Sequence, residues 1–187
     1  MASTAAERKA KQKCKHGTNF LLIQSHLASA THEMNNLQLK AQRQGLGLTV
    51  AEIADIAKVT KRSFQYWEAG KVPVPHDVEM LIDAMASQYN LVLDLLLSDV
   101  ELATWRNTDP DHNPDKPMRI SPTLPFFHSF ELFFEKTGVQ NIVYWRIYQS
   151  VVSQLILTGK IVRLNDESEI PRNWEIWKWF NGYYDMN

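Results

Sequence analysis

Two short segments joined by a tight turn constrain the fold of this chain more than any other feature. In the first segment, 50–57, apolar residues recur at the spacing of one helix face, at Val50, Ile53, Ala54 and Ala57. The second segment begins at Lys61 and runs to Trp67. Only Lys58 and Val59 separate the first segment from the threonine that precedes the second. Two short helices with so brief a connection predict a helix-turn-helix.

Residues that start and stop helices stand at the right places around these two segments. Thr49 and Thr60 occupy the N-cap positions, and Glu52 lies where a capping box places its glutamate. Gly70 provides the left-handed residue that ends the helix 61–67. Pro75 opens the next helix, where its missing N–H costs nothing.

A mainly helical bundle surrounds this pair. We expect a first helix from Met34 to about Gln44, with its core side formed by Leu37, Ala41 and Leu46. A long fourth helix carries an apolar seam with alternating spacings of four and three at Val78, Ile82, Met85, Tyr89, Val92 and Leu96. The seam can pack on its own domain or on a second copy of the chain. At 44% hydrophobic residues, the chain can bury a core.

The helix 61–67 presents a polar outward face that suits the DNA major groove. Phe64 and Trp67 are expected in the core, with Glu68 and Gly70 fixing the end of the helix. The expected base-reading residues are Arg62, Gln65 and Tyr66, because guanidinium and amide groups match guanine and adenine edges. The expected phosphate contacts are Lys61, Lys71, Lys40, Arg43, Thr49 and Thr60.

The charge distribution supports a local contact with a polyanion. The formal net charge is −1, but residues 34–75 hold six basic and three acidic residues, a net charge of +3. Residues 76–187 hold 9 basic and 16 acidic residues, a net charge of −7. A basic patch on an acidic body favours one nucleic-acid surface with little binding elsewhere.

The remaining chain divides into a linker and a second domain. The sequence predicts a helix-turn-helix domain over 34–104, a linker over 105–117, and a C-terminal domain over 118–187. In that domain we expect strands at 118–121 and 160–164, helices at 124–137 and 141–158, and a Trp-rich strap over 165–187. The C-terminal part is therefore α+β within a mainly α protein. Its large aromatic area favours a homodimer interface.

Residues 1–33 form a basic extension of low helical regularity, and translation can begin at Met1 or Met34. No apolar run reaches the ~20 residues of a membrane span.

Cys14 is the sole cysteine, which indicates a reducing cytoplasm. No cofactor is expected, and a zinc site is disfavoured because Cys14 and His16 are too close.

No catalytic site is expected. Gly45 and Gly47 begin a G-x-G pattern, but no strand precedes it. The acidic run at 109–115 resembles the start of a calcium loop, with Pro114 at the position that requires glycine. Glu131 and Glu135 share a helix face without a neighbouring base, which is typical of a solvated surface.

The string from Arg62 to Val78 (RSFQYWEAGKVPVPHDV) resembles the anti-CRISPR-associated repressors of the second type and their uncharacterised bacterial relatives. Residues 35–96 resemble the Xre-like helix-turn-helix. The segment Val143–Val152 (VYWRIYQSVV) is similar to the C-terminal dimerisation domain of the same group. This resemblance covers about two thirds of the chain.

The resemblance implies a homodimeric DNA-binding repressor on an inverted repeat in the promoter of its own operon. It matches Arg62, Gln65 and Tyr66 to recognition-helix positions. The expected dimer interface consists of Phe130, Phe134, Tyr144, Trp145, Tyr148 and Val152. Two other functions stay open: an antitoxin-type protein that neutralises a partner, and a translational regulator that binds structured RNA.

Overall fold

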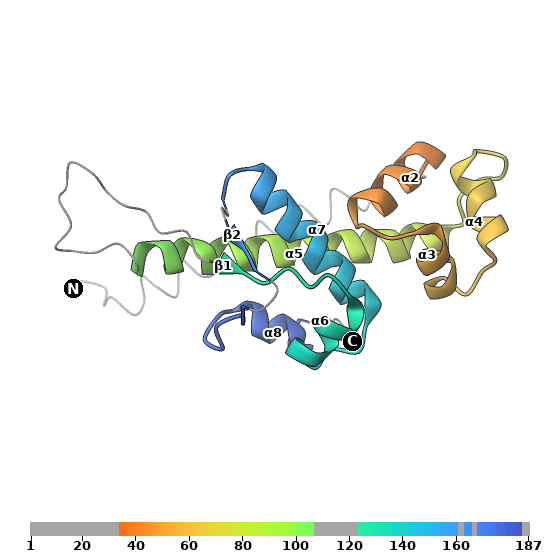
Figure 1. Cartoon of the computed structure of the whole chain (residues 1–187). Coiled ribbons are helices and arrows are strands. Elements are labelled where there is room, and N and C mark those ends of the chain that lie inside the picture. Colours follow the sequence, from red (N-terminus) through yellow and green to blue (C-terminus); the bar gives the residue numbers. More distant parts are fainter. Residues whose placement is uncertain (1–33, 107–122, 161–162, 166–167, 185–187) are drawn as a thin grey trace, which may run out of the picture. The chain divides into compact units, whose positions relative to one another are not determined.

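A computed structural model describes residues 34–106, 123–160, 163–165 and 168–184 of the 187-residue chain (Figure 1). These residues are mainly helical, with one small sheet, which confirms the predicted fold class. The N-terminal helices are α2 (Asn36–Gly45), α3 (Val50–Ile56), α4 (Lys61–Glu68) and α5 (His76–Arg106). The C-terminal elements are β1 (Thr123–Leu124), α6 (Phe130–Thr137), α7 (Ile142–Leu157), β2 (Arg163–Leu164) and α8 (Ile176–Phe180).

Helix α5 is the central element of the described structure. Its 31 residues pack against α2, α7 and α8. Five members of the predicted seam are buried and Tyr89 is half-buried, so this apolar stripe lies inside the chain's own core. By length and composition alone α5 could cross a membrane, but its buried stripe is also what the core helix of a folded domain requires.

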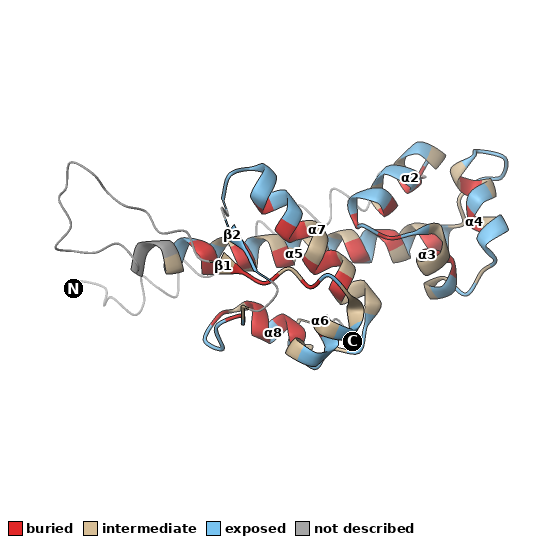
Figure 2. Ribbon diagram, viewed as in Figure 1, coloured by how far each residue is buried: buried red, intermediate tan, exposed pale blue. Residues whose placement is uncertain are grey.

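The expected core side of α2 was partly wrong. Leu37 and Ala41 are exposed, with Leu37 at 69%, whereas Leu39, Arg43 and Leu46 are buried (Figure 2). The helix begins after Asn35, whose side chain accepts the N–H groups of Leu37 and Gln38 in a capping box. Leu39, and not Leu37, therefore faces the core where α2 packs against α4 and α5.

The C-terminal helices begin at capping residues. Ser129 caps α6, so this helix starts later than the predicted residue 124, and Thr123–Leu124 instead pairs in parallel with Arg163–Leu164. Asn141 caps α7, one residue from the predicted start. The strand expected at 118–121 lies outside the described residues, and the expected 160–164 strand is observed at Arg163–Leu164.

Three residues of the expected dimer interface lie in the interior of the same chain instead. Tyr148 and Val152 are fully buried and Trp145 is 8% exposed. Tyr148 donates its hydroxyl to the carbonyl of Pro125, and burial raises its pKa. Only Phe134, at 45%, is an exposed member of the expected set.

The tail covers these aromatics. The Tyr144 ring stacks on Trp179 with centroids 4.2 Å apart, and Phe180 meets the edge of Phe133 at 5.7 Å. Trp174, Trp177, Trp179 and Phe180 are all buried, as the strap prediction requires. Trp179 and Phe180 of α8 therefore cover part of this aromatic area within the same chain.

Two polar side chains of α5, Asp99 and Gln88, attach α8 to this helix through three hydrogen bonds. The buried carboxylate of Asp99 accepts the backbone N–H groups of Glu175 and Ile176, at 2.9 and 3.1 Å. Burial raises the pKa of Asp99, and these two hydrogen bonds oppose that rise. Trp179 Nε1 donates to Gln88 at 2.7 Å. Asp99 therefore satisfies N–H groups at the start of α8, where Glu175 provides no side-chain cap.

Both expected domains share α5. Residues 34–187 form one compact unit, because α5 packs on α2 from the first expected domain and on α7 and α8 from the second. Most of the expected linker, 105–117, lies outside the described residues, as does the extension 1–33.

Candidate nucleic-acid interface

Helices α3 and α4 are joined by the tight turn that the sequence predicts. Thr49 caps α3 with Glu52 as its reciprocal partner: Glu52 N–H donates to the Thr49 hydroxyl, and Thr49 N–H to Glu52 Oε2. Thr60 caps α4 by accepting the Ser63 N–H at 3.1 Å. The oxygens of both threonines are thus engaged in capping, and both residues remain exposed.

Lys58 takes the left-handed conformation in this turn, with φ of 57°. Glycine adopts this geometry without strain, whereas lysine does so at a cost of roughly 1 kcal/mol. The Val59 N–H donates to Ala54 O at 2.9 Å and so closes the turn. The lysine side chain is exposed beside the start of α4.

Two buried aromatics hold α4 against the bundle. Phe64 is fully buried and Trp67 is 9% exposed, with their rings edge to face at 5.7 Å. Both were expected in the core. Their burial directs the opposite side of α4 toward solvent.

Arg43 was expected at a phosphate, but it forms an interior ion pair with Glu68. Its Nε donates to Glu68 Oε1 at 2.6 Å, and its Nη1 donates to Leu48 O at 2.6 Å. Both side chains of the pair are only 10% exposed. Arg43 therefore fastens the C-terminal end of α4 to α2, and its charge is already satisfied within the protein.

The end of α4 fits closely against α2. Gly70 has φ of 66°, and a Cβ placed there would lie 3.3 Å from the Asn36 side chain. Asn36 Nδ2 also donates to Glu68 O at 3.3 Å. A glycine is required here both for its backbone conformation and for this close approach.

The outward face of α4 carries Lys61, Arg62 and Gln65, all exposed, with Tyr66 half-buried beside them. Arg62 Nε donates to the Tyr66 hydroxyl at 2.7 Å. The Lys71 ammonium lies 4.9 Å from the centre of the Tyr66 ring. Tyr66 thus orients Arg62 and leaves the two terminal nitrogens of the guanidinium available to a ligand.

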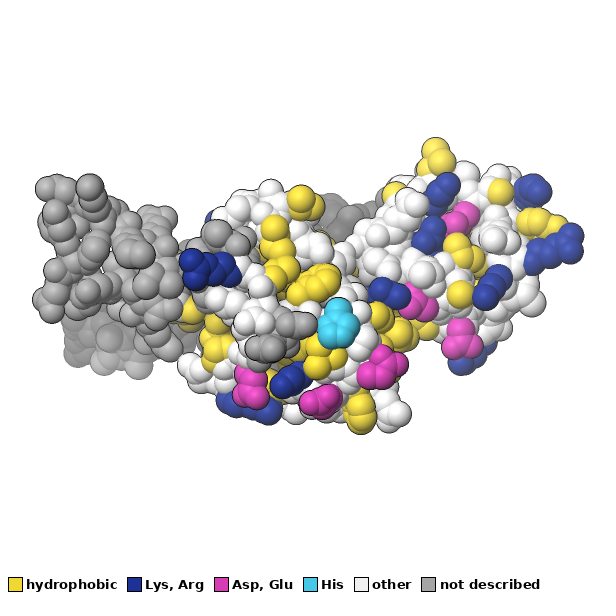
Figure 3. All heavy atoms as spheres, in the orientation of Figure 1, with side chains coloured by type: hydrophobic (Ala, Val, Ile, Leu, Met, Phe, Trp, Pro, Cys, Tyr) yellow, Lys and Arg dark blue, Asp and Glu magenta, His cyan; other side chains and the backbone are white. Residues whose placement is uncertain are grey.

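Exposed cations surround this face. Figure 3 shows Lys and Arg side chains gathered over α2, α4 and the loop after α4. The exposed members are Lys40, Lys58, Lys61, Arg62 and Lys71. Acidic residues are few here, and Glu68 and Glu52 are paired with arginines.

The contact of α2 and α3 with α7 could not be predicted from sequence patterns. Arg146 donates to Glu52 Oε1 through Nη2 at 2.8 Å and Nε at 3.0 Å. Ser150 Oγ donates to Gly45 O, at the end of α2. Burial alone would raise the pKa of Glu52, but hydrogen bonds from Thr49 and Arg146 hold it below its ordinary value. No helical spacing connects residues 94 positions apart, so periodicity could not reveal this pair.

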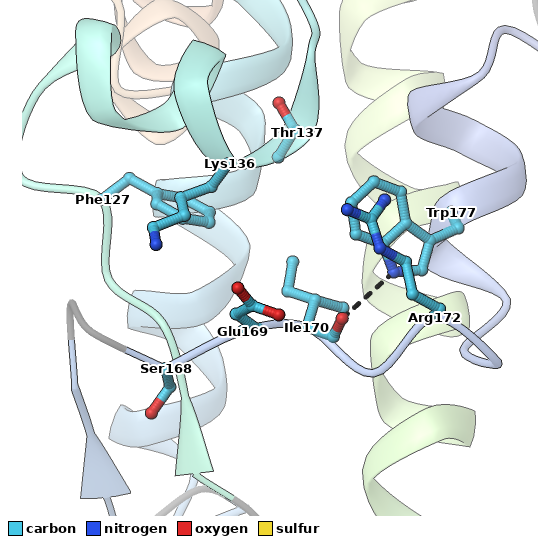
Figure 4. A pocket seen from close by; sticks show the side chains of 8 residues that line it. All are labelled: Phe127, Lys136, Thr137, Ser168, Glu169, Ile170, Arg172 and Trp177. Atoms are coloured by element: carbon cyan, nitrogen blue, oxygen red, sulfur yellow. Dashed lines mark hydrogen bonds between the residues drawn. The ribbon is translucent and has the colours of Figure 1, made fainter.

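The described residues hold no other centre with evident chemistry. Within these ranges no three His, Cys, Asp or Glu side chains gather as a metal site, and the zinc candidates of 14–32 fall outside them. A hollow beside α6 is bounded by Lys136, Glu169 and Arg172, with Trp177 bonded to Ile170 at its side (Figure 4). Its volume of about 10 Å³ has room for one water molecule at most.

Comparison with known proteins is consistent with this architecture. A family model described as Aca2/YdiL-like matches residues 34–163. The Aca2 repressor of Pectobacterium phage ZF40 is 31% identical over 130 residues, which cover 67% of this chain and 96% of that protein. The uncharacterized protein YdiL of Escherichia coli (strain K12) is 29% identical over 124 residues, covering 65% and 92%.

The matched region begins at Met34 and ends at Arg163. It includes α2, α3, α4, α5, α6 and α7, and it leaves out the extension 1–33 and helix α8. The chain belongs to the Aca2/YdiL-like family.

Proposed function

We propose that this protein is a sequence-specific DNA-binding transcriptional repressor that acts as a homodimer. The observation that carries the proposal is the exposed face of α4, where Lys61, Arg62 and Gln65 project from a helix held by two buried aromatics. The family relative named as a repressor supports the same reading. The protein is proposed to be a regulator without enzymatic activity.

In the proposed complex α4 lies in the major groove. Arg62 reads a guanine through its two terminal nitrogens, because Nε is already bonded to Tyr66. Gln65 lies three residues further along the same face of α4 and reads an adenine. Tyr66 serves mainly to orient Arg62 and contacts the groove with its exposed edge.

The surrounding cations hold the protein on the phosphates. Lys61, Lys71, Lys40 and Lys58 are exposed around α4, whereas Arg43 is excluded from this role by its ion pair. The hydroxyls of Thr49 and Thr60 lie at the starts of α3 and α4, where helix N-termini favour phosphate groups. Each phosphate contact releases counterions from the DNA, so the DNA affinity should fall as the salt concentration rises.

The dimer contact is proposed at the joined ends of α5 and α7. Lys160 and Glu101 lie 3.9 Å apart there, and α5, α7 and β2 carry exposed apolar side chains. These are Leu102 at 49%, Ile156 at 37%, Leu157 at 83% and Leu164 at 38%. An exposed apolar patch of this kind is unfavourable in water and is typical of a surface that a partner covers. The two helix-turn-helix units of the dimer would then bind half-sites about one DNA turn, ~34 Å, apart.

The proposed target is an inverted repeat upstream of the protein's own gene, where binding reduces transcription of the operon in the cytoplasm. The experiment is a gel shift of the purified protein on that upstream region at two salt concentrations. Scrambled duplex and a hairpin RNA from the same transcript serve as competitors. The proposal requires a salt-sensitive shift that resists both competitors and protects two symmetric half-sites. If scrambled duplex abolishes the shifted operator band, binding is not sequence-specific. If only the hairpin RNA abolishes it, DNA is not the main target.

A further inference from the structure

Helix α7 holds the end of α2 and the start of α3 through two polar side chains. Arg146 donates to Glu52 Oε1, at 2.8 Å through Nη2 and at 3.0 Å through Nε. One turn further along α7, the Ser150 hydroxyl donates to the carbonyl of Gly45 at the end of α2. Residues four apart lie on one face of a helix, so a single face of α7 contacts both α2 and α3.

The backbone between these two contacts also lies close to α7. Gly47, in the connection from α2 to α3, has φ of 71°. A Cβ placed on it would lie 3.7 Å from Arg146 O and 3.9 Å from Ser150 Cβ. The two polar contacts and this close approach fall within one short stretch, residues 45–52. The connection is therefore fitted against α7.

These hydrogen bonds fix an angle that apolar packing leaves loose. Helix α2 also packs against α5, but apolar contacts are not directional. A hydrogen bond, in contrast, weakens steeply when its angle changes. The Arg146 guanidinium forms two such bonds to one carboxylate oxygen of Glu52, a side chain that is only 19% exposed. A rotation of α3 relative to α7 therefore breaks hydrogen bonds that packing on α5 does not replace.

Helix α7 connects this contact to the proposed dimer surface. Ile156 and Leu157 are exposed at its C-terminal end. At a rise of 1.5 Å per residue, Leu157 lies about 16 Å along the helix from Arg146. On the other side, the ion pair of Arg43 with Glu68 joins α2 to the end of α4. A continuous connection thus runs from α4 through α2 and α7 to the surface where a second copy is proposed to bind.

We propose that Arg146 and Ser150 are positioning residues that determine which spacing of operator half-sites the protein accepts. They fix the angle of α4 relative to the dimer contact and themselves contact no DNA. This inference rests on the proposed function. One base pair added between half-sites moves them about 3.4 Å apart and rotates one of them by roughly 35°. Two α4 helices held at fixed angles cannot both follow that change, so one half-site loses its contacts.

The test measures the DNA affinity of the full-length protein by fluorescence anisotropy on a set of duplexes. Each duplex carries the two half-sites protected in the upstream region, at their native spacing or with one base pair inserted or removed between them. A duplex with a single half-site is the reference, and scrambled duplex measures non-specific binding. We expect the parent to bind the native spacing about tenfold or more tighter than either altered spacing.

Arg146→Ala should reduce this spacing preference to about threefold or less, because α3 can then rotate relative to α7. Its affinity for the single half-site should stay within about twofold of the parent's, because the proposed base contacts on α4 are unchanged. Arg146→Lys keeps a cation beside Glu52 and should show a preference between those of the parent and Arg146→Ala. Ser150→Ala leaves the Glu52 pair intact and should lower the preference by a smaller factor. Lower stability alone reduces binding to all duplexes alike and does not change the ratio.

Arg172→Ala is the matched control. Arg172 also lies over a tryptophan ring, 4.0 Å from the centre of Trp177, but it belongs to the segment before α8. This variant should keep the parent's spacing preference. Circular-dichroism melting should show each variant folded at the assay temperature. If Arg146→Ala is unfolded, the decision rests on Ser150→Ala and Arg146→Lys, which should both have a lower preference than the parent.

Three results overturn the inference and leave the proposed function in place. The parent binds all spacings equally well, the folded α7 variants keep the parent's preference, or Arg172→Ala loses the preference to the same extent as they do. A parent that binds the half-site duplexes no better than scrambled duplex contradicts the proposed function, and this inference with it.

Discussion

Glu52 and Arg146 form an ion pair that joins α3 to α7. One oxygen of the Glu52 carboxylate accepts a hydrogen bond from Arg146 at 2.8 Å. The other oxygen accepts from the Thr49 N–H at 2.7 Å. One side chain therefore caps α3 and also fixes α3 against the C-terminal part of the chain. Arg146 in turn lies over the ring of Trp145, 4.3 Å from its centre.

Replacing Arg146 with alanine should destabilise the protein, because Glu52 then loses a partner in a site that is only 19% exposed. We expect the free energy of unfolding to fall by about 1–3 kcal/mol in urea denaturation. Lys178→Ala is the control, since the pair of Lys178 with Glu175 is exposed to solvent and lies outside the proposed dimer contact. Exposed pairs contribute about 0–1 kcal/mol. Equal losses in the two variants would show that the Glu52–Arg146 pair does not join these parts.

The same pair should make stability depend on acid pH. The pKa of Glu52 in the folded protein lies below its ordinary value of 4.5. A lowered carboxyl pKa contributes stability that is fully present above pH 4.5 and is lost as the pH falls through the folded value. The free energy of unfolding of the parent should therefore exceed that of Glu52→Gln by a constant amount near pH 7. This difference should shrink below pH 4.5. A difference that stays constant down to pH 3 would contradict the ion pair.

Arg43 and Lys40 are both basic residues of α2, but they should behave differently when replaced. Arg43→Ala leaves Glu68 buried without its partner, which costs about 3 kcal/mol or more in the free energy of unfolding. Lys40 is exposed, so Lys40→Ala should change stability by less than about 0.5 kcal/mol. Lys40→Ala should instead make the slope of log DNA affinity against log salt concentration smaller by about one. A stable Arg43→Ala protein with a reduced salt slope would restore Arg43 as a phosphate contact.

Leu157 should decide the oligomeric state. It is 83% exposed at the end of α7, and Leu157→Glu places a charge in the proposed dimer contact. Sedimentation at micromolar concentration should show a dimer for the parent and a monomer for this variant, with weaker operator binding. Leu37→Glu, at an equally apolar exposed position on α2, should remain a dimer. Dimeric Leu157→Glu would place the dimer contact elsewhere, and a monomeric parent would contradict the dimer itself.

Local signals predicted the N-terminal helices well. Thr49, Thr60 and Pro75 determine where α3, α4 and α5 begin through hydrogen bonds within a few residues, and such short-range rules are readable in sequence. The rotation of α2 was wrong because Leu37 and Leu39 are both apolar. Which of them points inward depends on how α2 packs against α4 and α5.

The contacts that sequence reasoning missed join residues far apart in the chain. Arg43 reads as a free cation until the fold places Glu68 beside it, 25 residues away. Tyr148 and Val152 were predicted at a dimer interface because helical spacing identifies an apolar face of a helix. The spacing does not show which part of the chain packs on that face. Phe180 of the tail helix α8, which lies beyond the family match, packs on Tyr148 with ring centroids 6.0 Å apart.

In the proposed complex Arg62 on α4 reads a base, whereas Lys71 holds a phosphate. Fluorescence anisotropy should measure the affinity of the parent, Arg62→Ala and Lys71→Ala for the upstream operator and for scrambled duplex at matched salt. Arg62→Ala should lower the operator-to-scrambled ratio by roughly tenfold to a hundredfold. Lys71→Ala should weaken both duplexes alike and leave this ratio unchanged. If Arg62→Ala retains the parent's ratio, α4 does not read the operator through Arg62 and the account is wrong.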